Sequence, residues 1–245
     1  MNQRTNDCRF MNLRWMVGLA LLVCLLMPVL ARADSEKEQQ RLKESGDVIK
    51  DLLTKDRGIP LDLLNKAECV IILPSVKKAG FIIAGQYGRG AMTCRTGENF
   101  DGPWSAPIMM QSSGGSIGFQ AGGQATDFVV LVMNDKGART MLHGKAKLGG
   151  DASIAAGPMG KTAEAATNAS MNAEMLSYSH SNGVFAGVSL SGTTMGPDDD
   201  ANKDLYGKKV SGEEIFKSEK APPAAETMLS MLTEKSPKPT SAGKS

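Results

Sequence analysis

The stretch from Lys145 to Gly192, KAKLGGDASIAAGPMGKTAEAATNASMNAEMLSYSHSNGVFAGVSLSG, decides the fold and allows three interpretations. It has almost no bulky residue before Tyr178 and is crowded with Gly, Ala and Ser, which is typical of a linker. It also contains GPMGKT, which is similar to the end of a nucleotide phosphate-binding loop. Yet apolar residues recur at strand spacing on both sides of residues 162–172: Leu148, Ile154, Val184, Phe185, Val188 and Leu190.

The spacing of the glycines argues against a nucleotide-binding loop. The pattern GxxxxGK[ST] that ends at Gly160-Lys161-Thr162 needs a Gly at position 155, where this chain has Ala155. The preceding segment is rich in Gly and Ala, whereas such loops follow a hydrophobic strand. We therefore predict no nucleotide partner and interpret the stretch as sheet, in which small side chains allow backbones to approach closely.

Residues 1–33 are predicted to be a signal peptide. Three Arg residues precede an apolar run from Trp15 to Leu30, and Ala31-Arg32-Ala33 fits a cleavage site. This run is shorter than the roughly 20 residues that a membrane-spanning helix needs. We expect an exported chain that begins at Asp34 and is periplasmic or secreted, with peripheral membrane association left open.

Charge and cysteine content narrow the function further. The chain has 28 Lys and Arg against 26 Asp and Glu. Residues 1–33 hold four Arg and one Asp, so the predicted mature chain has 24 basic and 25 acidic residues. This balance argues against a nucleic-acid partner, which needs a concentrated basic footprint. Cys69 and Cys94 form an even pair in an exported chain and are predicted to be bonded. With only His143 and His180 besides them, they make no zinc site.

An α+β fold is expected, with a single domain over residues 34–217. An amphipathic helix is predicted from Asp34 to Arg57, followed by the strand CVIIL at Cys69–Leu73, which Pro74 ends, and a turn at Ser75–Lys78. The later short strands with Gly-containing breaks predict a curved, mostly antiparallel, Gly-rich sheet that is barrel- or sandwich-like. Short C-terminal helices are expected, and residues 218–245 are interpreted as a polar, Pro-rich tail.

No catalytic constellation is readable. The chain has no GxSxG elbow, His143 and His180 are interpreted as surface or turn residues, and Asp127 and Asp151 are single acids without a readable partner carboxylate. The acidic run Asp198–Asp200 lacks the Gly and Glu that a calcium loop needs. We therefore expect no enzyme, no cofactor and no metal.

Seven motifs in order resemble the SYLF-domain family, over about residues 40–217. They are GIP..LL at Gly58–Leu64, CVIILPSVKKAGFIIAGQYGRG at Cys69–Gly90, WSAP at Trp104–Pro107, SIGFQAGGQATDFVVLVMN at Ser116–Asn134, LGGDASIAAGPMGKTAEA at Leu148–Ala165, YSHSNGVFAGVSLSG at Tyr178–Gly192 and N..LYG at Asn202–Gly207.

The resemblance implies lipid binding, because eukaryotic members bind phosphoinositide membranes through basic residues and an amphipathic N-terminal helix. Some of them also bind actin, and neither ligand is expected in a bacterial envelope. The residues that would meet lipid phosphate are Lys77, Lys78 and Arg89 in one hairpin, and Lys145, Lys147 and Lys161 near the Gly/Ala-rich stretch.

The apolar stripe of the first helix has two interpretations, membrane contact or packing on the sheet, and it consists of Leu42, Ile49, Leu52 and Leu53. The expected function is a non-catalytic module of the bacterial envelope that binds phospholipid or a membrane surface. The alternative is a structural or interaction component with an envelope protein as its partner.

Overall fold

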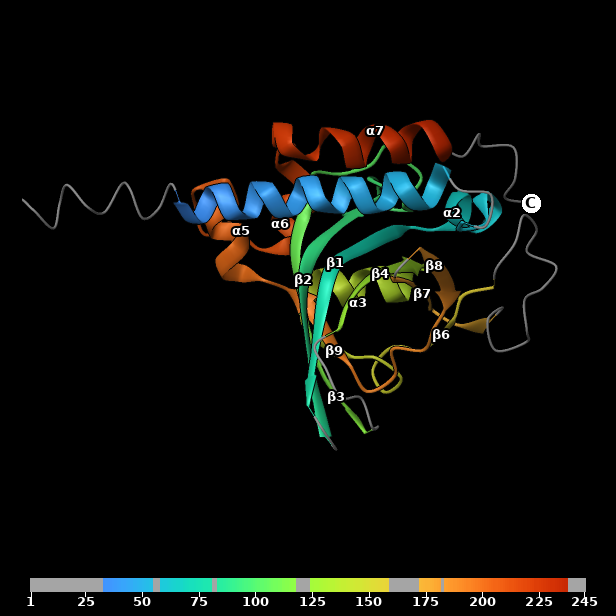
Figure 1. Ribbon diagram of the computed structural model, residues 1–245. Coiled ribbons are helices and arrows are strands. Elements are labelled where there is room, and N and C mark those ends of the chain that lie inside the picture. The colour runs from blue at the N-terminus through green and yellow to red at the C-terminus, as the bar shows by residue number, and fades with distance from the viewer. Residues whose placement is uncertain are drawn as a thin grey trace, which may run out of the picture.

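One curled, nine-stranded sheet organises the molecule, and helices cover one end of it (Figure 1). The computed structural model describes residues 33–54, 58–80, 83–117, 124–158, 172–181 and 183–237. The α+β class, the N-terminal helix and the short C-terminal helices are confirmed. The predicted signal peptide, apart from Ala33, lies outside the described residues. No helix among those residues is long and apolar enough to span a membrane.

The strand order is β5-β9-β3-β2-β1-β4-β7-β6, with β8 also paired to β7. Neighbours are antiparallel except β6 and β7, which are parallel. The strands are β1 Cys69–Gly80, β2 Ile83–Cys94, β3 Ile108–Ile117, β4 Gln124–Val132, β5 Ala146–Lys147, β6 Ile154–Ala156, β7 Met175–Ser181, β8 Val184–Gly187 and β9 Thr194–Pro197. The helices are residues 33–54, α2 Leu61–Lys66, α3 Asp135–His143, α5 Asp199–Tyr206, α6 Gly212–Ser218, the 3-10 helix η2 Pro223–Ala225, and α7 Glu226–Lys235.

The central pair β1 and β2 is longer than predicted. The structure corrects the expected end at Pro74 and the turn at Ser75–Lys78, because β1 continues through both to Gly80. A register shift between Leu73 and Val76 accommodates the Pro, which lacks an amide hydrogen. Ser75 adopts a φ of 50° there, and its backbone N–H donates to Asp127 Oδ1 at 2.8 Å.

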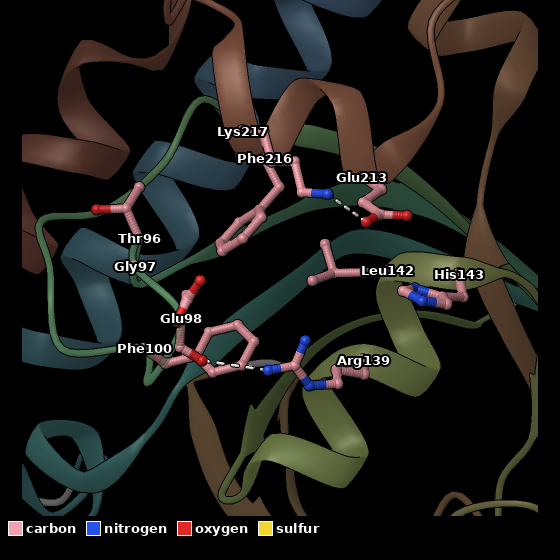
Figure 2. Close-up of a pocket in the computed structure, with 10 residues that line it drawn as sticks. All are labelled: Thr96, Gly97, Glu98, Phe100, Arg139, Leu142, His143, Glu213, Phe216 and Lys217. Atoms are coloured by element: carbon pink, nitrogen blue, oxygen red, sulfur yellow. Dashed lines mark hydrogen bonds and ion pairs between the residues drawn. The ribbon is translucent and has the colours of Figure 1, made fainter.

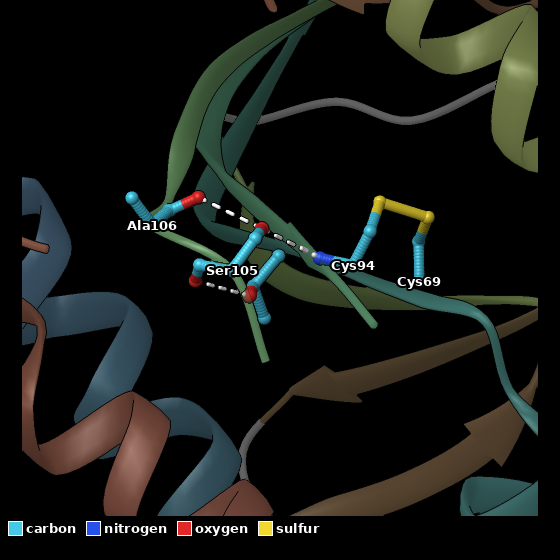
Figure 3. Close-up of a disulfide and its surroundings, with 5 residues drawn as sticks. Cys69, Cys94, Ser105 and Ala106 are labelled. Atoms are coloured by element: carbon cyan, nitrogen blue, oxygen red, sulfur yellow. Dashed lines mark hydrogen bonds between the residues drawn. A yellow bond between two sulfur atoms is a disulfide. The ribbon is translucent and has the colours of Figure 1, made fainter. Parts of the chain in front are cut away.

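The predicted disulfide is confirmed and links directly opposed residues of β1 and β2. Cys69 and Cys94 are register partners, and their sulfur atoms are 2.05 Å apart (Figure 3). The Cys94 backbone N–H also donates to Ser105 Oγ at 3.2 Å, which fixes the returning WSAP segment beside the bond. Both cysteines are buried in the core on one face of the sheet, so the bond lies inside the packed domain.

Alternation along β1 gives the sheet two buried faces. Cys69, Ile71 and Leu73 face a core shared with α3 and α6, whereas Val70 and Ile72 face the N-terminal helix, α2 and α7. The second of these is called the helix face below. Four apolar residues of the N-terminal helix are buried in it, and they are Leu42, Ile49, Leu52 and Leu53. Of the two interpretations of this apolar stripe, the structure therefore shows packing on the sheet. These side chains are not available to a membrane.

The folded region extends beyond the predicted boundary at Lys217. Met228 and Leu232 of α7 are buried against the N-terminal helix and the sheet, so residues 218–237 pack on the domain, where a tail was expected. At Gly46, a Cβ atom would lie 2.9 Å from Thr227 Cβ, so the missing side chain lets the two helices approach. Buried Arg95 then donates to the Ser236 backbone oxygen at 2.7 Å and holds the end of α7.

The Gly/Ala-rich stretch is sheet only in part. Residues 146–156 hold two short strands, β5 and β6, which a turn at residues 149–151 separates, and β7 pairs with β8 in an antiparallel hairpin. Close approach is also confirmed. A Cβ on Gly157 would lie 2.1 Å from the Tyr178 ring, and one on Gly187 would lie 2.0 Å from the Gly157 oxygen. The Gly160-Lys161-Thr162 segment lies outside the described residues.

Candidate functional site

Strand register brings distant predicted residues into one line across the sheet. Lys77 on β1 is opposite Tyr87 on β2, which is opposite Ser113 on β3. Ser113 is opposite Thr194 on β9, which is opposite Lys147 on β5. Directly opposed residues of antiparallel strands project to the same face. With about 4.8 Å between strands, the path along the sheet from Lys77 to Lys147 is about 19 Å. These five residues are called the basic row.

The basic row lies on the helix face, in a part of the sheet that the helices do not cover. Arg89 is two residues from Tyr87 and therefore shares its face, and it contacts Glu38 of the N-terminal helix. Figure 1 shows β1, β2 and β3 extending well beyond the helices. Tyr87 is 51% exposed, and Gly85 and Gly115 have open space where a side chain would be. The sheet thus presents a bare backbone surface around an aromatic ring and Lys residues.

Lys145 adds a third cation to this surface. It lies against Gly196, since a Cβ on Gly196 would be 2.8 Å from Lys145 Cγ. Gly196 is opposite Gln111, and Gln111 is opposite Arg89, so this line runs beside the basic row. Lys77, Lys145 and Lys147 are all exposed, and none makes an ion pair with any residue that the structure describes. We call these three lysines with Tyr87 the basic face.

Arg89 is held within the protein instead. Its Nε donates to Asp198 Oδ2 at 2.6 Å, and Glu38 Oε1 is 3.7 Å from Nη1. Burial lowers the pKa of Arg89, but the hydrogen bond to Asp198 and the charges of Asp198 and Glu38 offset this and leave the pKa raised. Asp198 also accepts the Ala201 N–H and so caps α5. Arg89 therefore ties β2 to two helices.

For two other predicted lipid-binding residues, the structure does not describe the side chain. Lys78 is opposite Gln86 and Gln124 on the neighbouring strands, and its side chain lies outside what the structure describes. Lys161 lies outside the described residues altogether. Sequence reasoning missed Tyr87, Ser113 and Thr194. An aromatic residue between glycines in GQYGRG was a usable signal for Tyr87, whereas the other two depend on register, which no local pattern encodes.

A pocket of about 390 Å³ between α3, α6 and the loop after β2 is the other charged site (Figure 2). Phe100 and Phe216 form its apolar wall, with ring centroids 5.6 Å apart. Its main cations are already neutralised, because Arg139 pairs with Asp135 and Lys217 pairs with Glu213 at 2.5 Å. An anionic ligand would have to compete with these carboxylates, so the basic face is the better anion site.

One His lies between two carboxylates at the other border of the helix face. His180 Nδ1 is 3.4 Å from Asp127 Oδ2, and Nε2 is 3.6 Å from Asp51 Oδ2, which joins β7, β4 and the N-terminal helix. Within the described ranges, no group of three or more His, Cys, Asp or Glu side chains is placed to hold a metal ion.

The chain is similar in sequence to proteins of one described family. The model of the Ysc84 family, described as "Las17-binding protein actin regulator", matches residues 113–235. An SH3 domain-containing protein of Schizosaccharomyces pombe is 39% identical over 170 residues, which are 68% of this chain and 39% of that protein. Protein YSC84 of Saccharomyces cerevisiae is 36% identical over 72% of this chain and 38% of its own length.

Human SH3 domain-containing YSC84-like protein 1 is 32% identical over 72% of this chain and 51% of its own length. The chain thus spans about two-fifths to one-half of these relatives. The family model covers half of the chain, and its region includes half of β3, all of β4 and β9, and the C-terminal helices. The chain therefore belongs to the Ysc84 family, whose domain is the SYLF domain that its motifs resemble.

Proposed function

We propose that the chain is a non-catalytic module that binds an anionic phospholipid surface through its basic face. The observation that carries the proposal is a set of three exposed lysines on the same sheet face as Tyr87, without ion pairs to described residues, where no described helix covers the sheet. Each Lys near an anionic membrane contributes about 1 kcal/mol. Tyr is favoured at the membrane interface, where its ring meets the acyl boundary and its hydroxyl stays hydrated.

The architecture suits a surface contact rather than an insertion. The apolar stripe of the N-terminal helix is buried in the protein, so binding would depend on charge and on one aromatic ring. Such binding is screened by salt and should be reversible. Neither a nucleotide nor a nucleic acid is part of this proposal.

The proposed compartment is the bacterial envelope, with the mature chain in the periplasm or secreted. Residues 1–33 support this compartment, because a basic segment is followed by an apolar run and then by a cleavage site of small residues. N-terminal sequencing of the protein isolated from a periplasmic fraction should begin at Asp34. Intact Met1 in that fraction would contradict the cleavage.

Co-sedimentation of the mature chain with vesicles tests the lipid contact. Phosphatidylglycerol vesicles should bind it, phosphatidylcholine vesicles should not, and added salt should release it. The triple variant Lys77→Ala, Lys145→Ala, Lys147→Ala should lose about two orders of magnitude in affinity, since three contributions of about 1 kcal/mol disappear.

A matched control changes the same net charge elsewhere. Lys136, Lys208 and Lys217 are exposed and ion-paired away from the basic face, so their triple Ala variant should bind nearly as well as the unmodified protein. Equal loss in both variants would show that only bulk charge matters. No binding of the unmodified protein to phosphatidylglycerol would refute the lipid proposal.

A second candidate is a protein-interaction role, which the relatives' names favour. One relative of 35% identity is LAS seventeen-binding protein 3 of Saccharomyces cerevisiae, named for a protein partner. Crosslinking in delipidated envelopes separates the two candidates. A single protein partner that is lost in the Lys77/Lys145/Lys147 variant, together with an absence of vesicle binding, would favour this role.

A further inference from the structure

A second cavity lies on the reverse side of the same end of the sheet. Gln86 alternates with Tyr87 along β2, and Thr126 alternates with Ala125 along β4, so both project away from the basic face. They open into a pocket of about 280 Å³ between β2, β3, β4, β7 and the segment after β8. Its described lining is Gln86, Gly115, Thr126, Phe128, Ser179, Ser181, Val188, Ser189, Leu190, Ser191 and Thr193, which we call the hydroxyl pocket.

The chemistry of this lining is unusual for a gap between packed elements. Six hydroxyls and one amide line it, and none of the described lining residues is charged. Phe128, Val188 and Leu190 supply the apolar part of its wall. A charged ligand would lose its hydration here without meeting a counterion, which is costly, so the lining selects against ions.

Several of these polar groups have no hydrogen-bond partner among the residues that the structure describes. Thr126 is 9% exposed and Thr193 is 6% exposed, yet neither hydroxyl bonds to another described residue, and neither is sealed from solvent. The Gln86 amide and the Ser181 hydroxyl also lack a partner in the described part of the chain. Thr193 is positioned by Gly114, because a Cβ on Gly114 would lie 3.1 Å from the Thr193 Oγ1. Polar side chains that are largely buried and unsatisfied are normally satisfied by water or a ligand.

We propose that the hydroxyl pocket binds an uncharged polyhydroxylated ligand, a sugar ring. Each Ser or Thr hydroxyl donates one hydrogen bond and accepts two, and an amide does both, so a ligand whose every group also donates and accepts can satisfy them all. The apolar wall suits the C–H face of the ring. The volume corresponds to about nine waters, which fits one ring better than a lipid chain or a drug-sized molecule.

The site is independent of the proposed lipid contact. The two lie on opposite faces of the sheet, and neither Tyr87 nor any lysine of the basic face lines the pocket. The ligand chemistry has two sources, a free saccharide or the sugar headgroup of a glycolipid. Both would present the same ring to the pocket.

Saturation-transfer NMR and amide-shift titration test the proposal on the protein purified as cells make it. The probes are glucose and N-acetylglucosamine, with glucuronate as the anionic counterpart of glucose. Neutral sugars should give saturable binding that shifts the amides around Thr126 and Thr193, and glucuronate should bind more weakly. A glycosyl diacylglycerol in phosphatidylcholine vesicles tests the second source, and stronger binding to it than to free glucose would assign the ligand to a membrane.

Substitutions locate the binding. Thr126→Val and Thr193→Val keep the side-chain shape, and each should weaken Kd by about 2- to 12-fold, the effect of one neutral hydrogen bond. Thr194→Val is the matched control, because Thr194 neighbours Thr193 on the opposite face and should leave Kd unchanged. The Lys77/Lys145/Lys147 variant should also retain sugar binding, which separates this result from the lipid test.

Three outcomes would overturn the proposal. They are no saturable binding of either neutral sugar in free or vesicle-bound form, equal or tighter binding of glucuronate, and unchanged Kd in both Thr126→Val and Thr193→Val. Thermal denaturation of each variant keeps the last outcome interpretable, since a variant with an unchanged Tm has kept its fold.

Discussion

Arg89 offers the sharpest test of the difference between a binding residue and a structural one. Sequence motifs place it among the lipid-binding residues, whereas the structure pairs it with Asp198, 109 residues later in the chain. Replacing it by Met keeps the aliphatic stem that packs on the sheet and removes only the guanidinium. We expect this variant to lose stability rather than affinity for anionic vesicles.

The magnitude follows from what the guanidinium leaves behind. Asp198 is 4% exposed and would keep only the Ala201 N–H as a partner, at 3.2 Å. Breaking a fully buried pair costs about 3–5 kcal/mol, whereas a surface pair contributes about 0–1 kcal/mol. The Arg89 side chain is 29% exposed, which puts it between these limits. We therefore expect a loss of about 2–3 kcal/mol, or about 4–12 °C in Tm for a domain of this size.

Urea denaturation of Arg89→Met measures the free energy of unfolding, and Arg139→Ala is the control. Arg139 forms a similar two-bond pair with Asp135, but on the surface, so its loss should change stability little. The double variant Arg89→Met, Asp198→Asn should recover part of the stability, since it removes the unpaired charge. The reasoning fails if Arg89→Met unfolds like the unmodified protein, or if it loses vesicle binding while its stability is unchanged.

Three further predictions address the disulfide, the tyrosines and the C-terminal helix. Reducing Cys69–Cys94, which closes a loop of 25 residues, should lower the free energy of unfolding by about 3.5 kcal/mol on the chain-entropy estimate, and a Tm equal with and without reductant would contradict this. Burial raises the pKa of Tyr178 and of Tyr206. Their neutral forms therefore stabilise the fold below about pH 10, and this stability should be lost as pH rises above that value, because only the unfolded chain can ionise there. Urea midpoints that stay constant between pH 8 and pH 11 would oppose this. Met228→Ala on α7 should lower the free energy of unfolding by about 2–5 kcal/mol in the same assay, as for a core Met. A loss as small as that of a surface substitution would contradict the packing of residues 218–237 on the domain.

Much of the fold could be predicted because its signals are local. Apolar spacing identified the N-terminal helix, the run CVIIL identified the start of β1, and an even pair of cysteines in a chain predicted to be exported indicated their bond. The predictions that were wrong also rested on local signals, and contacts between distant segments overrode those signals. Pro74 normally ends a strand, yet β1 passes through it because β4 supplies the Ser75 contact and the register shift. The polar and Pro-rich composition of residues 218–245 indicated a tail, yet α7 packs on the domain because Gly46 lets the N-terminal helix approach it closely.

The sequence by itself determined which residue types were available: scattered lysines, small residues around them, and no catalytic or nucleotide pattern. Only the tertiary structure decided which of them act together. A single strand pattern tells which face a residue shares with its neighbours two positions away, but pairing order and register depend on contacts between distant segments. That is why Lys77 and Lys147 form one row with Tyr87 between them, while Arg89, two residues from Tyr87, is held by Asp198.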